Sequence, residues 1–170
     1  MLLDFDPDVV AVASQPFWLS WRDEGRMRRH APDFFARRVD GAGVVVDVRA
    51  DERVEPADVE AFEATARACA QAGWLFRRVG TPDAVLAGNV RWLSRYRHPR
   101  CGRRREVADR LLEVFAQPRP LFAGAAEVGD RLAVLPVLYH LMWRQVLAAD
   151  LTAEPLASSC LVGPGGGGQW

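Results

Sequence analysis

Residues 33–50 constrain the fold more than any other part of the chain. They read DFFARRVDGAGVVVDVRA, in which two strand-like runs, 33–39 and 44–50, flank the turn sequence DGAG. Aromatic and β-branched residues favour strands, and a short Asp/Gly turn between two such runs predicts a β-hairpin. We therefore expect an antiparallel hairpin here. Two further strand-like runs precede it, at 9–14 and 17–21.

The segment after the hairpin predicts a helix followed by another strand. Residues 56–73 carry apolar side chains at helical spacing, with Pro56 suited to a first turn and Gly73 to a C-terminal cap. Residues 74–79, WLFRRV, read as a strand. A strand, a helix and a second strand in this order favour a parallel crossover connection. The first half of the chain is therefore predicted to be α/β.

The second half changes to a helical pattern. The expected helices are 83–96, 104–116 and 135–151. The breakers His98-Pro99 and Cys101-Gly102 mark a boundary near residue 100. The predicted division is an α/β domain at 1–98, a helical domain at 99–162 and a disordered Gly-rich tail at 163–170.

Composition limits the compartment and the class of protein. No apolar run approaches the roughly 20 residues of a membrane span, and the N-terminus lacks the layout of a secretory signal. Three scattered cysteines form neither a disulfide framework nor a four-ligand zinc set. We expect a cytoplasmic protein with no membrane partner. The formal net charge is zero and every basic residue is arginine, so arginine must take any role usually given to lysine.

The hairpin can bring two carboxylates and a cation together. Alternate residues of a strand share a face, so Asp47 and Arg49 lie on the same side. With an odd number of turn residues, Asp40-Gly41-Ala42, Asp33 would oppose Arg49 and Phe35 would oppose Asp47. Asp33, Asp47 and Arg49 would then converge, whereas a two-residue turn would place Asp33 on the other face. The expected buried side comprises Phe34, Ala36, Val44, Val46 and Val48.

Two carboxylates and a cation on one sheet face suit Mg²⁺-dependent phosphodiester cleavage. Carboxylate oxygens hold the metal, the metal activates water, and the cation steadies developing charge. The alternative is a solvated sheet face with an ordinary ion pair, since motifs this short also arise by chance.

The segment HAPDFFARR…GVVVDVRAD resembles the PD-(D/E)xK motif of the restriction-endonuclease-like fold. With LLDFDPDVVAVASQPFWLSW before it and PVLYHLMWRQVLAADL after it, the chain resembles the TnsA-like endonuclease subunit of heteromeric transposases. The resemblance covers nearly the whole chain except its Gly-rich tail. It implies a restriction-endonuclease-like mixed sheet flanked by helices, with a helical C-terminal part for which a winged-helix arrangement is one option.

The resemblance also implies roles and partners. Asp33 and Asp47 match the metal-binding acidic positions, and Arg49 matches the lysine of the motif. The implied cofactor is Mg²⁺ or Mn²⁺. The implied partners are DNA, a separate integrase-like transposase subunit and an ATPase regulator.

Two departures from the family pattern bear on activity. Arginine stays protonated, so Arg49 can hold a phosphate but is a poor general base. The family also draws a metal-binding glutamate from a helix ahead of the first strand. We expect either that this helix lies upstream of Met1 or that the protein lacks this ligand.

A second basic region lies at residues 91–105. It interleaves arginines with Trp92 and Tyr96 and has no acidic residue, which suits phosphate contact. The predicted DNA-binding residues are Arg95, Arg97, Arg100, Arg103, Arg104 and Arg105. The alternative is a solvated helix end with a basic loop. Arg26, Arg28 and Arg29 could extend this surface, and His30 is expected at the site rim or on the surface.

Three functions remain open on the sequence. The first is a Mg²⁺-dependent DNA endonuclease subunit of a transposase, cutting at transposon ends. The second is a catalytically degenerate DNA-binding or assembly subunit of the same fold. The third is a restriction-type nuclease unrelated to transposition.

Overall fold

A computed structural model describes residues 1–23 and 25–166, and it divides the chain into two compact units. The sheet unit is Asp8–Pro82, and the helical unit joins Met1–Pro7 to the chain from Asp83 onward. The expected boundary at 98 and 99 falls inside the helical unit. The reason is that helix α3 (Ala84–Leu93) packs on α6 (Arg131–Trp143) and so belongs with the helices that follow it.

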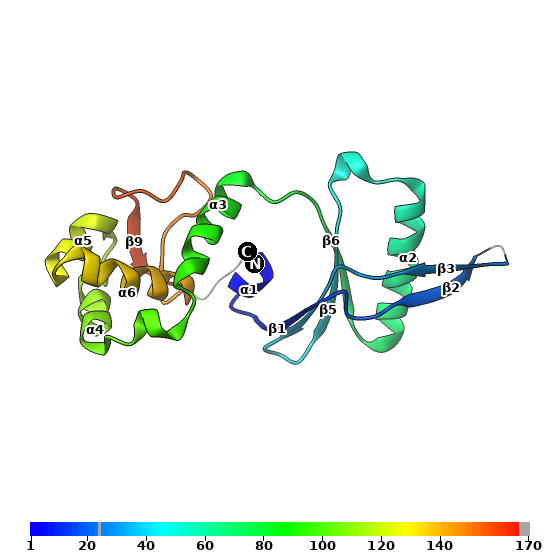
Figure 1. The fold of residues 1–170 in the computed structure, drawn as a ribbon, viewed down its shortest axis with the longest axis horizontal. Coiled ribbons are helices and arrows are strands. Elements are labelled where there is room, and N and C mark those ends of the chain that lie inside the picture. The colour runs from blue at the N-terminus through cyan, green and yellow to red at the C-terminus, as the bar shows by residue number, and fades with distance from the viewer. Residues whose placement is uncertain (24, 167–170) are drawn as a thin grey trace. The chain divides into compact units, whose positions relative to one another are not determined.

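The sheet unit is built on a four-stranded mixed sheet in the order β1-β4-β5-β6. Its strands are β1 (Val9–Ser14), β4 (Phe34–Arg38), β5 (Gly43–Val48) and β6 (Leu75–Val79). The first two pairings are antiparallel, and β5 pairs with β6 in parallel. Helix α2 (Pro56–Ala72) makes the crossover between β5 and β6, as the sequence predicted (Figure 1).

Local chemistry defines both ends of α2. Glu55 and Asp58 form a reciprocal capping box around Pro56 in the first turn. Gly73 ends the helix in the left-handed region at φ 70°, which a residue without Cβ adopts readily. The short 3-10 helix η1 (Asp51–Arg53) leads from β5 to the N-terminal capping box of α2.

The β4–β5 turn has an odd number of residues, but its register differs from the expected one. Arg38 N–H donates to Ala42 O at 2.9 Å, so the turn is residues 39–41. Phe34 then pairs with Val46, and the next position of this register sets Asp33 opposite Asp47 rather than opposite Arg49. The slip is two residues, so the carboxylates of Asp33 and Asp47 keep a common face.

The burial of β5 also differs from the expected pattern. Val44 and Val46 are buried as predicted, whereas Val48 is 44% exposed. Val45 and Asp47, on the other face, are buried as well, at 0% and 2% exposure. The reason is that both faces of the strand are covered, which agrees with the continuous apolar run at residues 44–46.

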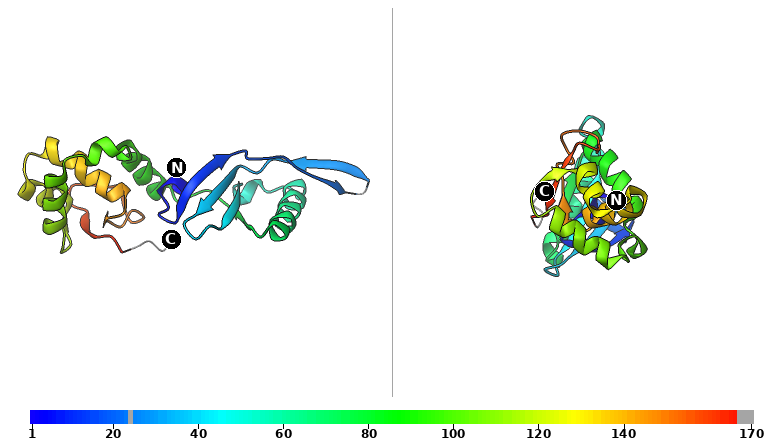
Figure 2. Two further views of the ribbon diagram at one scale, coloured as in Figure 1. Left: turned by 90° about the horizontal axis from the view of Figure 1, so that it is seen from below. Right: turned by 90° about the vertical axis from the view of Figure 1, so that its left-hand side faces the viewer.

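A second hairpin, β2 (Leu19–Asp23) and β3 (Arg26–His30), forms a separate two-stranded sheet. In Figures 1 and 2 its ribbons extend beyond the four-stranded sheet and α2. The strand-like run at 17–21 was expected, but β3, with the sequence RMRRH, was not. It lacks the apolar alternation of a half-buried strand.

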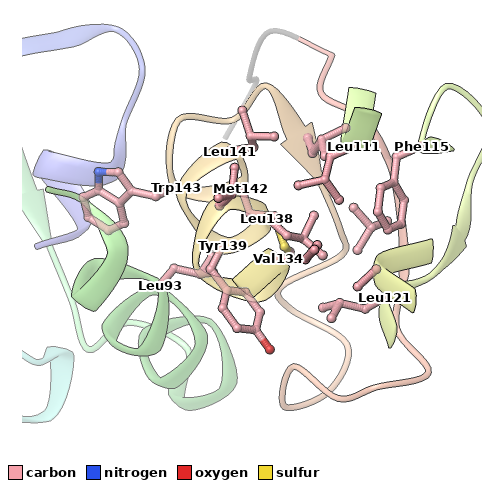
Figure 3. Close-up of a cluster of buried hydrophobic side chains, with 14 of the residues drawn as sticks. Leu93, Leu111, Phe115, Leu121, Val134, Leu138, Tyr139, Leu141, Met142 and Trp143 are labelled. Carbon is pink, nitrogen blue, oxygen red and sulfur yellow. The ribbon is translucent and has the colours of Figure 1, made fainter. Parts of the chain in front are cut away.

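The helical unit contains the largest core of the protein. Its elements are α1 (Leu2–Phe5), α3, the 3-10 helices η2 (Ser94–Tyr96) and η3 (Pro99–Gly102), α4 (Arg105–Val114), β7 (Arg119–Pro120), α5 (Leu121–Val128), α6, β8 (Leu147–Ala148) and β9 (Leu161–Pro164). Buried side chains of α6, among them Val134, Leu138 and Met142, pack with Leu111 of α4 and with Phe115, which follows that helix (Figure 3).

The C-terminal segment of the helical unit differs from the prediction at two places. The expected helix 135–151 begins earlier, at Arg131, and ends at Trp143, because Gln145 at φ 54° turns the chain into β8. The expected disordered tail begins too early, since Gly163 and Pro164 pair with β8 in strand β9. Residues 167–170 of that tail lie outside the described residues. No helix in the described part of the chain is long and apolar enough to span a membrane.

Candidate active site

Asp33 and Asp47 face each other where β4 begins and β5 ends, and each carboxylate bonds the backbone of the opposite segment. Asp33 N–H donates to Asp47 Oδ1 at 3.2 Å, and Val48 N–H donates to Asp33 Oδ2 at 2.7 Å. These reciprocal bonds fix both side chains at one edge of the hairpin. The predicted convergence of the two carboxylates on one face is therefore present.

His30 joins this pair, so the structure places it at the site rim, one of the two positions expected for it. Its Nε2 lies 3.0 Å from Asp47 Oδ1 and 2.9 Å from Asp47 Oδ2. An ionised carboxylate only accepts, so Nε2 carries the hydrogen and donates it to both oxygens. His30 ends β3, and its side chain is 23% exposed whereas that of Asp47 is 3% exposed. The contact depends on where an unpredicted strand ends, so no local pattern indicated it.

The two carboxylates retain free acceptor positions. A carboxylate offers about four lone pairs. The hydrogen bonds of Asp47 occupy both lone pairs of Oδ1 and one of Oδ2. Asp33 Oδ1 accepts no hydrogen bond from the described residues. One oxygen from each aspartate is thus available at the same edge of the sheet.

Arg49 lies beyond the two carboxylates, but its guanidinium is held by a different acid. Its Nη2 is 3.0 Å from Asp58 Oδ1, in the capping box of α2, and its side chain is 45% exposed. Arg78 Nη1 donates to the Arg49 carbonyl at 3.0 Å, and Arg78 Nη2 pairs with Asp51 at 2.6 Å. The predicted cation is therefore near the strand end and accessible, while paired with α2.

Cys69 of α2 is the titratable neighbour on the covered face. Burial raises the pKa of the Cys69 thiol, and the Asp47 carboxylate raises it further. The thiol is 3% exposed and unpaired with another cysteine.

The predicted DNA-binding arginines lie in the helical unit. All six are exposed, on η2, η3, the start of α4 and the residues between these elements: Arg95, Arg97, Arg100, Arg103, Arg104 and Arg105. Arg97 pairs with Asp4 at 3.6 Å, and Arg95 lies over the Trp92 ring at 4.7 Å. Arg104 donates to the Ala133 carbonyl at 3.3 Å.

Another kind of metal site would be built from three or more protein ligands. Among the described residues, no group of three or more His, Cys, Asp or Glu side chains is arranged to hold a metal. The spacing His98-x-x-Cys101 therefore has no further ligands around it. A cation bound by Asp33 and Asp47 would rest on two protein ligands, as is common for Mg²⁺, which keeps several waters.

A mixed sheet with an α-helical crossover and paired aspartates at neighbouring strand ends is consistent with the restriction-endonuclease-like class. Within that class, residues 6–80 match the family model described as TnsA-like endonuclease N terminal. These residues are thus similar to the N-terminal domain of TnsA-like endonucleases. The match begins two residues before the sheet unit and ends two residues before its end. No curated protein matches the chain.

Proposed function

We propose that the protein is a Mg²⁺-dependent DNA endonuclease subunit of a heteromeric transposase that cleaves DNA at transposon ends. The observation that supports the proposal most directly is the Asp33–Asp47 pair, with one available oxygen on each residue, inside the segment that matches TnsA-like endonucleases. The family implies a DNA substrate and a transposase partner.

The donor set fits Mg²⁺ or Mn²⁺ in type, because both ions prefer carboxylate oxygen and water. Asp33 Oδ1 and Asp47 Oδ2 would hold the ion. When bound, the metal would polarise a phosphate and activate water. The backbone N–H groups of Asp33 and Val48 keep both carboxylates oriented toward that position. His30 fixes the rotation of the Asp47 carboxylate through its two-oxygen contact.

Arg49 would act on substrate charge rather than as a base. Its guanidinium stays protonated at working pH. The ion pair between Arg49 and Asp58 is partly exposed, so solvent screens it. A DNA phosphate can therefore compete with Asp58 for Arg49. Arg49 would then hold a phosphate oxygen beside the two aspartates.

The test is plasmid nicking by the full chain with Mg²⁺ or Mn²⁺ and the partner transposase present. We expect Asp33→Ala and Asp47→Ala to reduce nicking to background. The matched control is Asp40→Ala, which removes a carboxylate from the exposed turn of the same hairpin and should leave nicking intact. Cleavage by Asp47→Ala at the rate of the unchanged protein would contradict the proposal.

One observation favours the second candidate, a DNA-binding or assembly subunit without catalysis. The residue in the lysine position is arginine and is engaged by Asp58. That reading predicts background nicking by every variant together with retained DNA and transposase binding. A restriction-type nuclease unrelated to transposition would instead cut efficiently without the transposase.

The helical unit supports a winged-helix arrangement as part of this proposal. Its elements follow the order α4, β7, α5, α6, β8 and β9, and the strands pair as β7-β9-β8. In a winged helix the second helix of the pair reads DNA, but α6 is largely buried. We therefore propose that contact with DNA in this unit goes through the exposed arginines Arg103, Arg104 and Arg105, without base reading.

A further inference from the structure

The β2–β3 hairpin has two chemically different faces. Opposed residues of an antiparallel pair share a face, so the register sorts the side chains. The inner face comprises Leu19, Trp21, Asp23, Arg26, Arg28 and His30. The outer face comprises Trp18, Ser20, Arg22, Met27 and Arg29. Burial agrees with this division, because four inner-face residues are partly covered and every outer-face residue is exposed.

The inner face is tied to the rest of the sheet unit. Arg28 lies 3.6 Å from Asp23 and 3.8 Å from Glu60 of α2. His30, at the end of β3, bonds Asp47. The hairpin is thus anchored at its base to one of the two aspartates of the candidate active site.

The outer face is positively charged, partly apolar and unpaired. Arg22 and Arg29 have no carboxylate within ion-pair distance among the described residues. Arg29 lies over the Trp18 ring at 5.0 Å. Trp18 and Met27 are 66% and 64% exposed and add two large apolar side chains to this face. The described residues of this face include no acid, whereas the inner face neutralises Arg28 with Asp23 and Glu60.

We propose that the outer face of the β2–β3 hairpin binds duplex DNA. A two-stranded β-ribbon fits the major groove, and arginines on it contact phosphates. Charge complementarity favours DNA over a partner without negative charge, because Arg22 and Arg29 have no acidic partner among the described residues. The bond between His30 and Asp47 ties the inner face of the hairpin to the candidate site, and the outer face that we propose for DNA lies on the opposite side of the ribbon. This inference rests on the proposed function, since it names how the same site holds its substrate.

The test compares two double variants of the full chain in duplex binding at several salt concentrations. Arg22→Ala/Arg29→Ala removes two charges from the outer face. Arg38→Ala/Arg67→Ala removes two charges of the same unit that are already paired with acids, Arg38 with Asp8 and Asp40 and Arg67 with Glu63, and is the matched control. We expect the outer-face variant to bind roughly tenfold or more weakly at low salt, with a salt slope shallower by about two. The control variant should bind nearly as the unchanged protein does.

Direct contact is checked with Trp18. DNA should change the tryptophan fluorescence of the unchanged protein, and this change should be reduced in Trp18→Phe. Circular dichroism and light scattering on each variant show whether it folds and whether its oligomeric state is unchanged.

The outcomes separate the inference from the proposed function. Failure of the unchanged protein to bind DNA overturns both. Normal DNA binding with equal losses in the two double variants, or with no loss in either, overturns the inference alone. An unchanged fluorescence response in Trp18→Phe, or an outer-face variant that changes only the oligomeric state, also overturns it, the latter by identifying a contact between copies of this chain.

Discussion

The two hairpins of the sheet unit have the same connectivity and opposite environments. In β4–β5, Val44, Val45 and Val46 are all buried, and the turn is closed by the Arg38–Ala42 hydrogen bond. In β2–β3, Met27 and its strand neighbours Arg28 and Arg29 are exposed. The first hairpin is stabilised by burial on both faces, whereas the second depends on its ladder and on a few anchors at its base.

The two hairpins therefore contribute different things to the proposed site. The buried hairpin fixes Asp33 and Asp47 through backbone hydrogen bonds that a rigid sheet keeps in place. The exposed hairpin contributes His30 at its end and arginines along its length. Precise geometry comes from packing, while surface charge is free to meet a partner.

The largest expected difference is in amide hydrogen exchange. Amides of β5 should exchange only through global unfolding, because both faces of that strand are covered. Amides of β2 and β3 should exchange through local opening. A global free energy of about 5 kcal/mol or more corresponds to at least roughly a thousandfold difference in protection. Mass spectrometry of exchanged peptides measures it, and equal protection of the two hairpins would remove the basis of the comparison.

A matched pair of truncations should separate the hairpins in stability. Val45→Ala leaves a cavity at a site with 0% exposure and should lower the free energy of unfolding by about 2 kcal/mol. Met27→Ala, on the exposed hairpin, should change it by less than about 0.5 kcal/mol. Urea denaturation followed by circular dichroism measures both. A Met27→Ala loss as large as that of Val45→Ala would show that the exposed hairpin packs against something else in solution.

The smallest expected effect concerns pH and Cys69, which lies over the buried hairpin. Because burial and the Asp47 carboxylate raise the pKa of the folded thiol, its contribution to stability is present below the ordinary thiol pKa. That contribution is lost as pH rises through the raised folded pKa. Cys69→Ser should therefore flatten the fall in stability above the ordinary thiol range, and Asp47→Asn should lower the pKa of Cys69. Thiol titration with a maleimide checks this, with the more accessible Cys101 as the internal reference.

The sequence predicted the buried hairpin well and the exposed one poorly, for the same physical reason. Aromatic and β-branched residues around DGAG reflect burial, so the strands, the odd turn and the shared face of Asp33 and Asp47 followed from them. The register was two residues off, because the turn lies at Val39-Asp40-Gly41, where Asp40 Oδ1 accepts from Ala42 N–H. That local bond cannot be distinguished from the neighbouring option by hydrophobic pattern alone.

The sequence did not predict exposed strands or contacts that depend on the tertiary fold. Strand β3 has no apolar alternation, since its side chains are mostly exposed. The contact between His30 and Asp47 depends on that strand and was therefore also missed. The pairing of Arg49 with Asp58 depends on where the capping box of α2 meets the end of β5, which requires the tertiary fold. The two-residue strands β7 and β8 are too short to leave any periodic signal.

The helical unit is discontinuous in the chain, and this has a consequence for biosynthesis. Phe5 packs against Trp143 with ring centroids 5.2 Å apart, and Gln145 Nε2 donates to the Phe5 carbonyl at 2.6 Å. A ribosome releases Asp8–Pro82 as a complete set long before Trp143 and Gln145 exist. The nuclease-like unit can therefore fold first, as early domains usually do. Helix α1 cannot complete its packing until Trp143 and Gln145 have been translated, and Phe5 stays exposed on the nascent chain until then.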